Sequence, residues 1–212
     1  KTSEGNLVSG YDMNYVAELM VKFDVLGLRT LTVVSEVCKR INLDITKIDL
    51  DDPNLYLNFA DLRTPQGLFQ IEAETNFKVC RKVKPKNLEQ LSAVIAIARP
   101  GALDFADDYA SYAYTGDFKV VHDFFKEELS YTGGIPLYQE QLMKMSNKIG
   151  FTLDEAEVLR RIVGKKKVEE AKKWQEKIKD KIKENNLAPE IGDILWRILE
   201  NSANYSFNKS HS

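Results

Sequence analysis

Residues 21–41 read VKFDVLGLRTLTVVSEVCKRI, and the spacing of the apolar residues changes in the middle of this stretch. Up to Gly27 the apolar residues alternate with Lys22 and Asp24, which is typical of a half-buried strand. Beyond Gly27 the apolar residues recur at helical spacing, at positions 28, 31, 34, 38 and 41. The stretch therefore predicts a strand over residues 18–27 that runs directly into a helix over residues 28–41.

The rest of the chain is dominated by helical patterns. Residues 88–98 predict a buried helix that stops at Arg99-Pro100-Gly101, and a short helical turn is expected around residues 55–59. Apolar positions 138, 142, 145 and 149 mark one helix, a capping box at Thr152 and Glu155 begins the next, and a stripe at 171, 174, 178 and 182 marks a third. Pro189 begins the last helix, and residues 68–70 fit a strand or a helix. The predicted fold class is mainly α with a short β-element.

Composition excludes several classes of protein. The chain has 212 residues, with 30 Lys and Arg against 32 Asp and Glu, so any nucleic-acid binding must come from a local cluster of charge. The longest nearly apolar stretch, residues 91–98, is far below the roughly 20 residues of a membrane-spanning helix. Two cysteines and two histidines are too few for a disulfide framework or a Cys/His zinc site. Together with a first residue other than Met, these features indicate an internal piece of a longer cytosolic protein.

A carboxylate on the predicted strand is the sharpest local signal. Asp24 lies two residues from Lys22 on the same face, and a half-buried charge is costly unless it is paired or binds a metal. Asp24 therefore points either to a metal site or to an ion pair with Lys22 or a cap of the following helix. The residues alone leave these alternatives open.

Two further segments carry candidate binding residues. Five cations gather at the end of one predicted helix and in the turn after it: Arg160, Arg161, Lys165, Lys166 and Lys167. They suit phosphate binding, and they equally suit a solvated helix end. The segment 205–212, YSFNKSHS, combines aromatic, amide, cationic and imidazole side chains, for which the alternative is a frayed chain end.

A series of motifs follows a fixed order along the chain. They are VKFDVLGLRTL at 21–31, GLFQ at 67–70, ARPG at 98–101, YQEQLM at 138–143, LRR at 159–161, GKK at 164–166 and FNKSHS at 207–212. With these motifs the sequence resembles the replicative DNA polymerases of family C, the bacterial DNA polymerase III alpha subunits. The resemblance covers residues 21–212.

The resemblance implies two domains. Residues 1–27 correspond to a palm-edge segment with the last palm strand, and residues 28–212 to the helical fingers domain, truncated at its C-terminal side. Asp24 matches a palm carboxylate that, in the family, joins an aspartate pair to hold two divalent ions, and Mg²⁺ suits such an oxygen-rich site. Lys22 would neutralise phosphate charge near the metals. Because no Asp-X-Asp pair precedes Lys22, the other metal ligands are expected outside this chain, and the fragment alone is expected to be inactive.

The resemblance also assigns roles in the fingers. It implies triphosphate or backbone-phosphate contacts for the cationic cluster of residues 160–167, with Arg99 and Lys209 as further candidates. Asn208 and His211 are expected near the nascent base pair. Tyr138 and Gln141 are expected to shape that surface rather than perform chemistry.

The implied function is part of a DNA-directed DNA polymerase that transfers nucleotides from dNTPs to a primer 3′ hydroxyl. Its expected partners are primer–template DNA, a dNTP and other replisome subunits, without a membrane, in the bacterial cytoplasm or in viral replication inside a bacterium. The region 104–129 fits the family poorly, and Ala98 and Ala102 depart from its usual loop. The alternative is a noncatalytic helical DNA- or protein-binding scaffold derived from a polymerase.

Overall fold

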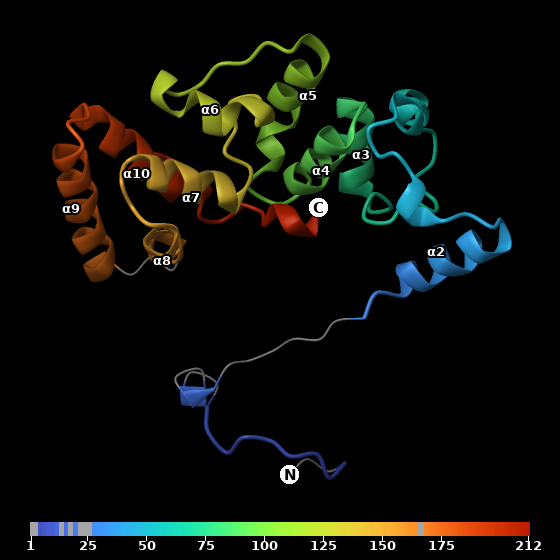
Figure 1. The fold of residues 1–212 in the computed structure, drawn as a ribbon, viewed down its shortest axis with the longest axis horizontal. Helices are drawn as coiled ribbons and strands as arrows, with labels where there is room; N and C mark the ends of the chain where they lie inside the picture. The colour runs from blue at the N-terminus through green and yellow to red at the C-terminus, as the bar shows by residue number, and fades with distance from the viewer. Residues whose placement is uncertain (1–3, 13–14, 17–18, 21–26, 165–167) are drawn as a thin grey trace. The chain divides into compact units, whose positions relative to one another are not determined.

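The computed structural model describes residues 4–12, 15–16, 19–20, 27–164 and 168–212, and it divides the chain into two compact units. Unit 1 comprises Lys1–Ile48 and unit 2 comprises Asp49–Ser212 (Figure 1). The division comes at residue 48, beyond the palm–fingers boundary proposed at residue 27, which stays a prediction. The two units are described separately below.

Unit 1 contains the predicted helix after Gly27. Helix α2 spans Arg29–Arg40, with Lys39 and Arg40 in its last turn, and the short 3₁₀ helix η1 follows at Ile45–Lys47. None of the residues of α2 is buried within the chain. Most of the strand predicted over residues 18–27 lies outside the described residues, although the described Leu19 is helical. Throughout the described ranges the only β-pairing is an isolated parallel bridge between Tyr138 and Phe207, so the mainly α prediction is confirmed.

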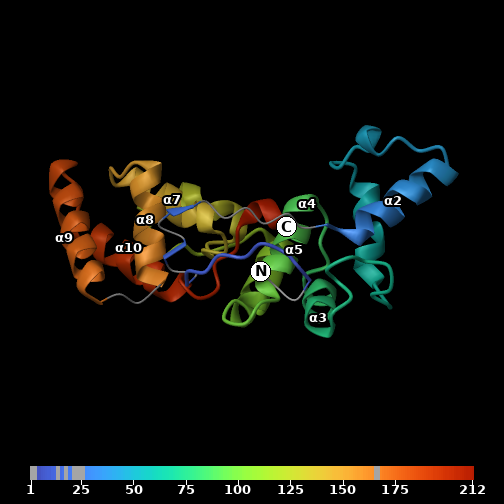
Figure 2. The same cartoon turned by 90° about the horizontal axis from the view of Figure 1, so that it is seen from below.

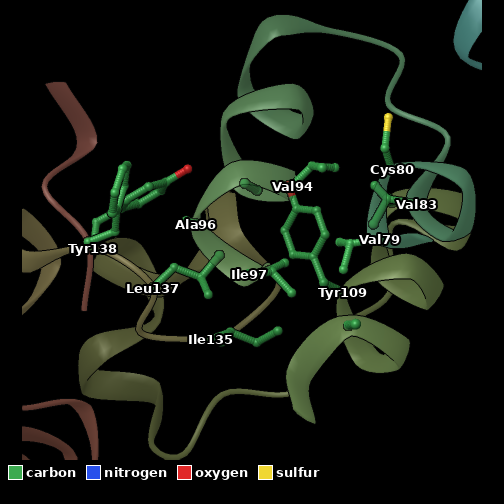
Figure 3. Packing of buried hydrophobic residues seen from close by; sticks show 14 of the residues in the cluster. Val79, Cys80, Val83, Val94, Ala96, Ile97, Tyr109, Ile135, Leu137 and Tyr138 are labelled. Atoms are coloured by element: carbon green, nitrogen blue, oxygen red, sulfur yellow. The ribbon is translucent and has the colours of Figure 1, made fainter. Parts of the chain in front are cut away.

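The first part of unit 2 packs three helices around one core. Its elements are η2 (Pro53–Asp61), α3 (Glu74–Val83), α4 (Leu88–Ile97), η3 (Leu103–Phe105) and α5 (Ala106–Thr115). Figure 3 shows Tyr109 of α5 beside Ile97 and Val94 of α4 and Val79 of α3. Tyr109 is only 1% exposed, and burial raises the pKa of its hydroxyl far above the usual value. These helices are joined mainly by buried apolar contact.

The second part of unit 2 has its own core. Its elements are η4 (Asp123–Phe125), α6 (Lys126–Leu129), η5 (Ser130–Thr132), α7 (Gln139–Lys148), α8 (Leu153–Gly164), α9 (Val168–Glu184) and α10 (Pro189–Ser202). The predicted stripe of α9 is buried at Trp174, Ile178 and Ile182 against α10. Figure 2 shows α8, α9 and α10 at one end of unit 2 and α3, α4 and α5 at the other.

Local sequence signals explain where several helices begin. The predicted capping box is present before α8, since Thr152 Oγ1 accepts from the Glu155 amide at 3.2 Å and Glu155 accepts from the Thr152 amide at 2.9 Å. Hydrogen bonds to its carboxylate also hold the pKa of Glu155 below its usual value. Asn87 caps α4 in a similar way, accepting from the amide of Gln90 at 2.9 Å. The predicted starts of α4, α8 and α10 are therefore confirmed.

Two regions differ from the sequence-based expectation. Residues 68–70 form a turn rather than a strand or helix, with Gln70 at a φ of 63°. Helices α3 and α5 were not predicted, because the apolar positions of α3 are few and α5 is rich in Tyr and Asp. Burial of Tyr109 and Cys80 in the first core overrides this weak local preference.

In the ranges that the structure describes, no helix is both long enough and apolar enough to cross a membrane.

Candidate functional site

The segment of residues 205–212, called here the closing segment, lies beside the start of α7 (Figure 1). The amide of Phe207 donates to the carbonyl of Leu137 at 2.9 Å, and the amide of Gln139 donates to the carbonyl of Phe207 at 2.9 Å. The two motifs YQEQLM and FNKSHS, which are far apart in sequence, are thereby joined backbone to backbone. This pairing fixes the register of the closing segment.

The loop after α4 packs on the same segment. Gly101 has a φ of 89°, and a Cβ at this position would lie 3.2 Å from Cβ of Tyr205. The Arg99 guanidinium lies over the Phe207 ring at 4.5 Å from its centroid. Arg99 is exposed, and no carboxylate in the described part of the chain pairs with it. Its outward N–H groups are therefore available to an anion.

Lys209 is held by its backbone and by its side chain. Its amide donates to the Glu140 carboxylate, with 3.2 and 3.1 Å to the two oxygens. Its ammonium contacts Glu89 at 2.7 Å and lies 4.8 and 5.5 Å from the ring centroids of Tyr131 and Tyr138. The cation therefore lies between a carboxylate and two aromatic rings.

The remaining residues of the motif complete a small cluster. Asn208 Oδ1 accepts from the amide of Ser210 at 3.0 Å, which caps the short helix η6 (Lys209–His211). His211 is exposed, with its ring 6.4 Å from that of Phe207. The structure thus brings together four predicted site residues, Arg99, Asn208, Lys209 and His211. With Phe207 they are called the tail cluster below.

A buried amide supports the tail cluster from beneath. Gln141 is fully buried, accepts from the Tyr138 amide at 2.8 Å and donates to Thr132 Oγ1 at 2.6 Å and to the Glu128 carbonyl at 3.0 Å. Gln141 therefore ties the start of α7 to α6 and η5. The expectation that Gln141 shapes the surface near the nascent base pair stays a prediction.

Two stacked tyrosines form the floor beneath Lys209. The rings of Tyr131 and Tyr138 are nearly parallel, with centroids 6.3 Å apart. Burial, reinforced by nearby Glu89 and Glu140, raises the pKa of Tyr131 to about 12 and raises that of Tyr138 further. Both phenols are therefore neutral near pH 7 and present aromatic faces to the ammonium.

The other described cations of the prediction lie on α8. Arg160 donates to Glu157 through Nε and Nη2, at 2.8 Å each, and Arg161 Nε donates to the same carboxylate at 2.7 Å. The hydrogen bonds from Arg160, then those from Arg161, hold the pKa of Glu157 below its usual value. The Arg161 side chain is 66% exposed against 19% for Arg160, so Arg161 is the more accessible of the two. No contact joins this arginine pair to the tail cluster in the described part of the chain.

Five predicted site residues lie outside the described residues: Lys22, Asp24, Lys165, Lys166 and Lys167. The metal ligand Asp24 and the roles of these lysines stay predictions. Among residues that the structure describes, no group of three His, Cys, Asp or Glu side chains is placed to hold a metal ion.

The sequence-based reasoning did not identify the acidic partners of the cations. Glu157 carries a recognisable signal, because it precedes Arg160 and Arg161 by three and four residues on one helix. Glu89 carries no such signal, since 120 residues separate it from Lys209. Only the packing of α4 against the closing segment brings Glu89 and Lys209 together.

Comparison with known proteins agrees with the motifs. The bacterial DNA polymerase III alpha subunit finger domain matches residues 30–186. The DNA polymerase III subunit alpha of Thermus aquaticus is 36% identical over 100% of this chain and 18% of its own length, and that of Aquifex aeolicus is 36% identical over 99% of this chain and 19% of its own. The corresponding subunit of Neisseria meningitidis serogroup B is 35% identical over 97% of this chain and 18% of its own length.

The chain spans about a fifth of the length of these relatives, and most of it matches their finger domain. It belongs to the family of bacterial DNA polymerase III alpha subunits.

Proposed function

We propose that this chain is the palm-edge and fingers part of a replicative DNA polymerase, and that its cations hold the phosphates of the incoming nucleotide and of DNA. The family membership supports DNA-directed DNA polymerase activity for the full-length protein. The relatives named above are bacterial, which favours replication in the bacterial cytoplasm over a viral setting.

The tail cluster is the observation that carries the proposal. Arg99 has no carboxylate partner in the described ranges, and the Phe207 ring supports its guanidinium from one face. Because the guanidinium is already held in place, it can donate hydrogen bonds to a phosphate with a smaller loss of side-chain conformational entropy than a free arginine. Asn208 and His211 belong to the same segment as Phe207: Asn208 caps η6, and the His211 ring lies 6.4 Å from that of Phe207.

The catalytic part of the proposal rests on Asp24 and Lys22. Mg²⁺, held by Asp24 and by carboxylates outside this chain, would supply the charge stabilisation of nucleotidyl transfer when bound. Lys22 would neutralise phosphate charge beside it. The chain alone is expected to lack synthesis.

Phosphate binding is tested by fluorescence anisotropy of this chain with a labelled primer–template over a salt series. We expect Arg99→Ala to weaken binding and to make the salt dependence shallower by about one phosphate contact. Arg63→Ala is the matched control, because Arg63 is exposed and pairs with Asp61 outside the tail cluster. The triple variant Lys165→Ala, Lys166→Ala, Lys167→Ala tests the predicted lysines in the same series. Equal salt slopes for the wild type and Arg99→Ala would contradict the role of Arg99.

The variant Asp24→Asn in the full-length protein distinguishes the polymerase proposal from the noncatalytic scaffold alternative. If Asp24 is a metal ligand, the variant loses primer extension in Mg²⁺ while it keeps primer–template binding. Intact primer extension would favour a noncatalytic role for this part of the protein.

A further inference from the structure

The ammonium of Lys209 already has an anionic partner. Nζ of Lys209 lies 2.7 Å from Oε2 of Glu89, and the two side chains are 34% and 55% exposed. Tyr131 and Tyr138 cover the ammonium with their ring faces, at 4.8 and 5.5 Å from the ring centroids. A phosphate that approaches Lys209 therefore meets the negative charge of Glu89 as well.

Glu89 is not needed to hold the closing segment in place. The backbone of Lys209 is held by Glu140, whose carboxylate accepts a hydrogen bond from the Lys209 amide. Phe207 is held by its backbone hydrogen bonds with Leu137 and Gln139. Within the described residues, the only hydrogen bond that the Glu89 side chain makes is the one from the Lys209 ammonium. The contact between the two side chains can therefore open without loss of the fold around it.

A carboxylate and a phosphate compete for a lysine on equal chemical terms. Both offer anionic oxygens to an ammonium, and Lys is a flexible point charge with three donors. The tyrosine faces attract the ammonium whichever anion it holds. Exchange of one anion for the other needs only a change in side-chain torsions.

We propose that Glu89 is an internal competitor that occupies the phosphate-binding position of Lys209. This inference rests on the proposed function, which makes Lys209 a phosphate ligand. Displacement of Glu89 favours ligands that bring more than one negative charge, because they also engage Arg99 or another cation at the same time. Glu89 thereby raises the selectivity of the site for polyphosphate or polynucleotide over a single phosphate group.

The α8 arginine pair has a different ion-pair geometry. Glu157 binds Arg160 through two parallel hydrogen bonds and also binds Arg161. That geometry is bidentate and local to one helix. Glu89, by contrast, makes a single contact with a monodentate cation, which is the weaker arrangement and the easier one to displace.

The test replaces Glu89 by Gln, which keeps the side-chain shape and removes the charge. The matched control is Glu74→Gln, because Glu74 pairs with Lys78 at 2.6 Å on the exposed surface of α3 and does not contact Lys209. Two probes distinguish the sources of phosphate: inorganic tripolyphosphate measured by calorimetry, and a labelled primer–template measured by anisotropy. Both are measured at low salt for the wild type, Glu89→Gln, Glu74→Gln, Lys209→Met and the double variant Glu89→Gln, Lys209→Met.

Glu89→Gln is expected to bind at least one of the two probes about two- to fivefold more tightly than the wild type, which is the range for loss of an exposed ion pair. Glu74→Gln is expected to show a smaller gain. The double variant should gain no more over Lys209→Met than Glu74→Gln gains over the wild type, because Glu89 then has no lysine ammonium to occupy. Thermal unfolding midpoints equal to that of the wild type would establish that the variants are folded.

Two outcomes overturn the inference in distinguishable ways. If Lys209→Met weakens binding and Glu89→Gln weakens it or leaves it unchanged, then Lys209 is a phosphate ligand and Glu89 is not its competitor. If neither probe responds to Lys209→Met, or neither binds at all, then the proposed phosphate-binding role of Lys209 fails, and the competition fails with it.

Discussion

The tail cluster and the α8 arginine pair both join cations to glutamates, but the two are built differently. On α8 the partners are three and four residues apart, so the helix alone brings Glu157 to Arg160 and Arg161. In the tail cluster the partners Glu89 and Lys209 are 120 residues apart and meet only because α4, α7 and the closing segment pack together. The first arrangement survives wherever α8 is folded, whereas the second reports on the tertiary structure of unit 2.

The comparison also separates the cations by availability. The Arg160 side chain is largely buried and pairs with Glu157, whereas the Arg161 side chain is mostly exposed. Arg99 has no carboxylate partner in the described part of the chain, and Lys209 has one that is held by a single contact. The availability of these cations to an anion therefore depends on their tertiary setting rather than on the number of cations in a sequence motif.

The largest expected effect comes from a variant that disrupts the support of the tail cluster and leaves α8 intact. Gln141→Leu removes the acceptor of the Tyr138 amide and the donor to Thr132 and to the Glu128 carbonyl. Buried groups left without partners cost about 1–3 kcal/mol each, so we expect the free energy of unfolding to fall by about 3 kcal/mol. Urea denaturation measures this, with Gln175→Leu as the control because Gln175 makes no hydrogen bond in the described part of the chain. An equal loss in both variants would show that Gln141 has no special role.

The second prediction concerns the response of the buried tyrosines to alkaline pH. The pKa of Tyr131 is raised to about 12 by burial, and those of Tyr138 and Tyr109 are raised further, from an ordinary value of 10.0. The folded protein keeps protons that the unfolded chain loses above about pH 10, so stability is full below pH 10 and falls as pH rises toward 12 and beyond. The tyrosinate absorbance of these buried tyrosines should therefore appear together with the loss of circular dichroism. Ionisation of all tyrosines near pH 10 in the folded protein would contradict this burial.

A moderate effect is expected at the start of α8. Thr152→Ala removes the Oγ1 acceptor for the amide of Glu155, and the loss of an N-cap costs about 1 kcal/mol. The tail cluster should be unaffected, so binding of primer–template should match that of the wild type while the urea midpoint falls. Reduced DNA binding by this folded variant would indicate that α8 and the tail cluster are coupled.

The smallest effect is expected from the arginine pair itself. Glu157→Gln weakens local ion pairs that are worth less than about 1 kcal/mol, so the free energy of unfolding should change little at neutral pH. The pKa of Glu157 is held below its ordinary 4.5, so its contribution is present above pH 4.5 and is lost as the pH falls through the lowered value. Comparing acid unfolding of the variant and the wild type measures this contribution. Identical acid transitions would show that the arginine pair adds nothing to stability.

The sequence alone determined the helices that have strong local signals. The capping box at Thr152, the proline at 189 and the apolar stripe of α9 were sufficient, because caps and periodicity act within one or two turns. The family also came from ordered motifs in the sequence, which named Arg99 and Lys209 as candidate phosphate contacts and Asn208 and His211 as candidates near the nascent base pair.

Only the tertiary structure decided which of these candidates lie together and which are engaged. Helices α3 and α5 form because the first core buries them. The residues that bury them are distant in sequence, so short-range patterns do not reveal them. Glu89 and Glu140 reach Lys209 across sequence separations of 120 and 69 residues. Local sequence signals account for helices such as α8, α9 and α10. Helices α3 and α5, and the charge environment of the candidate binding residues, depend instead on long-range packing, which leaves no short-range pattern in the sequence.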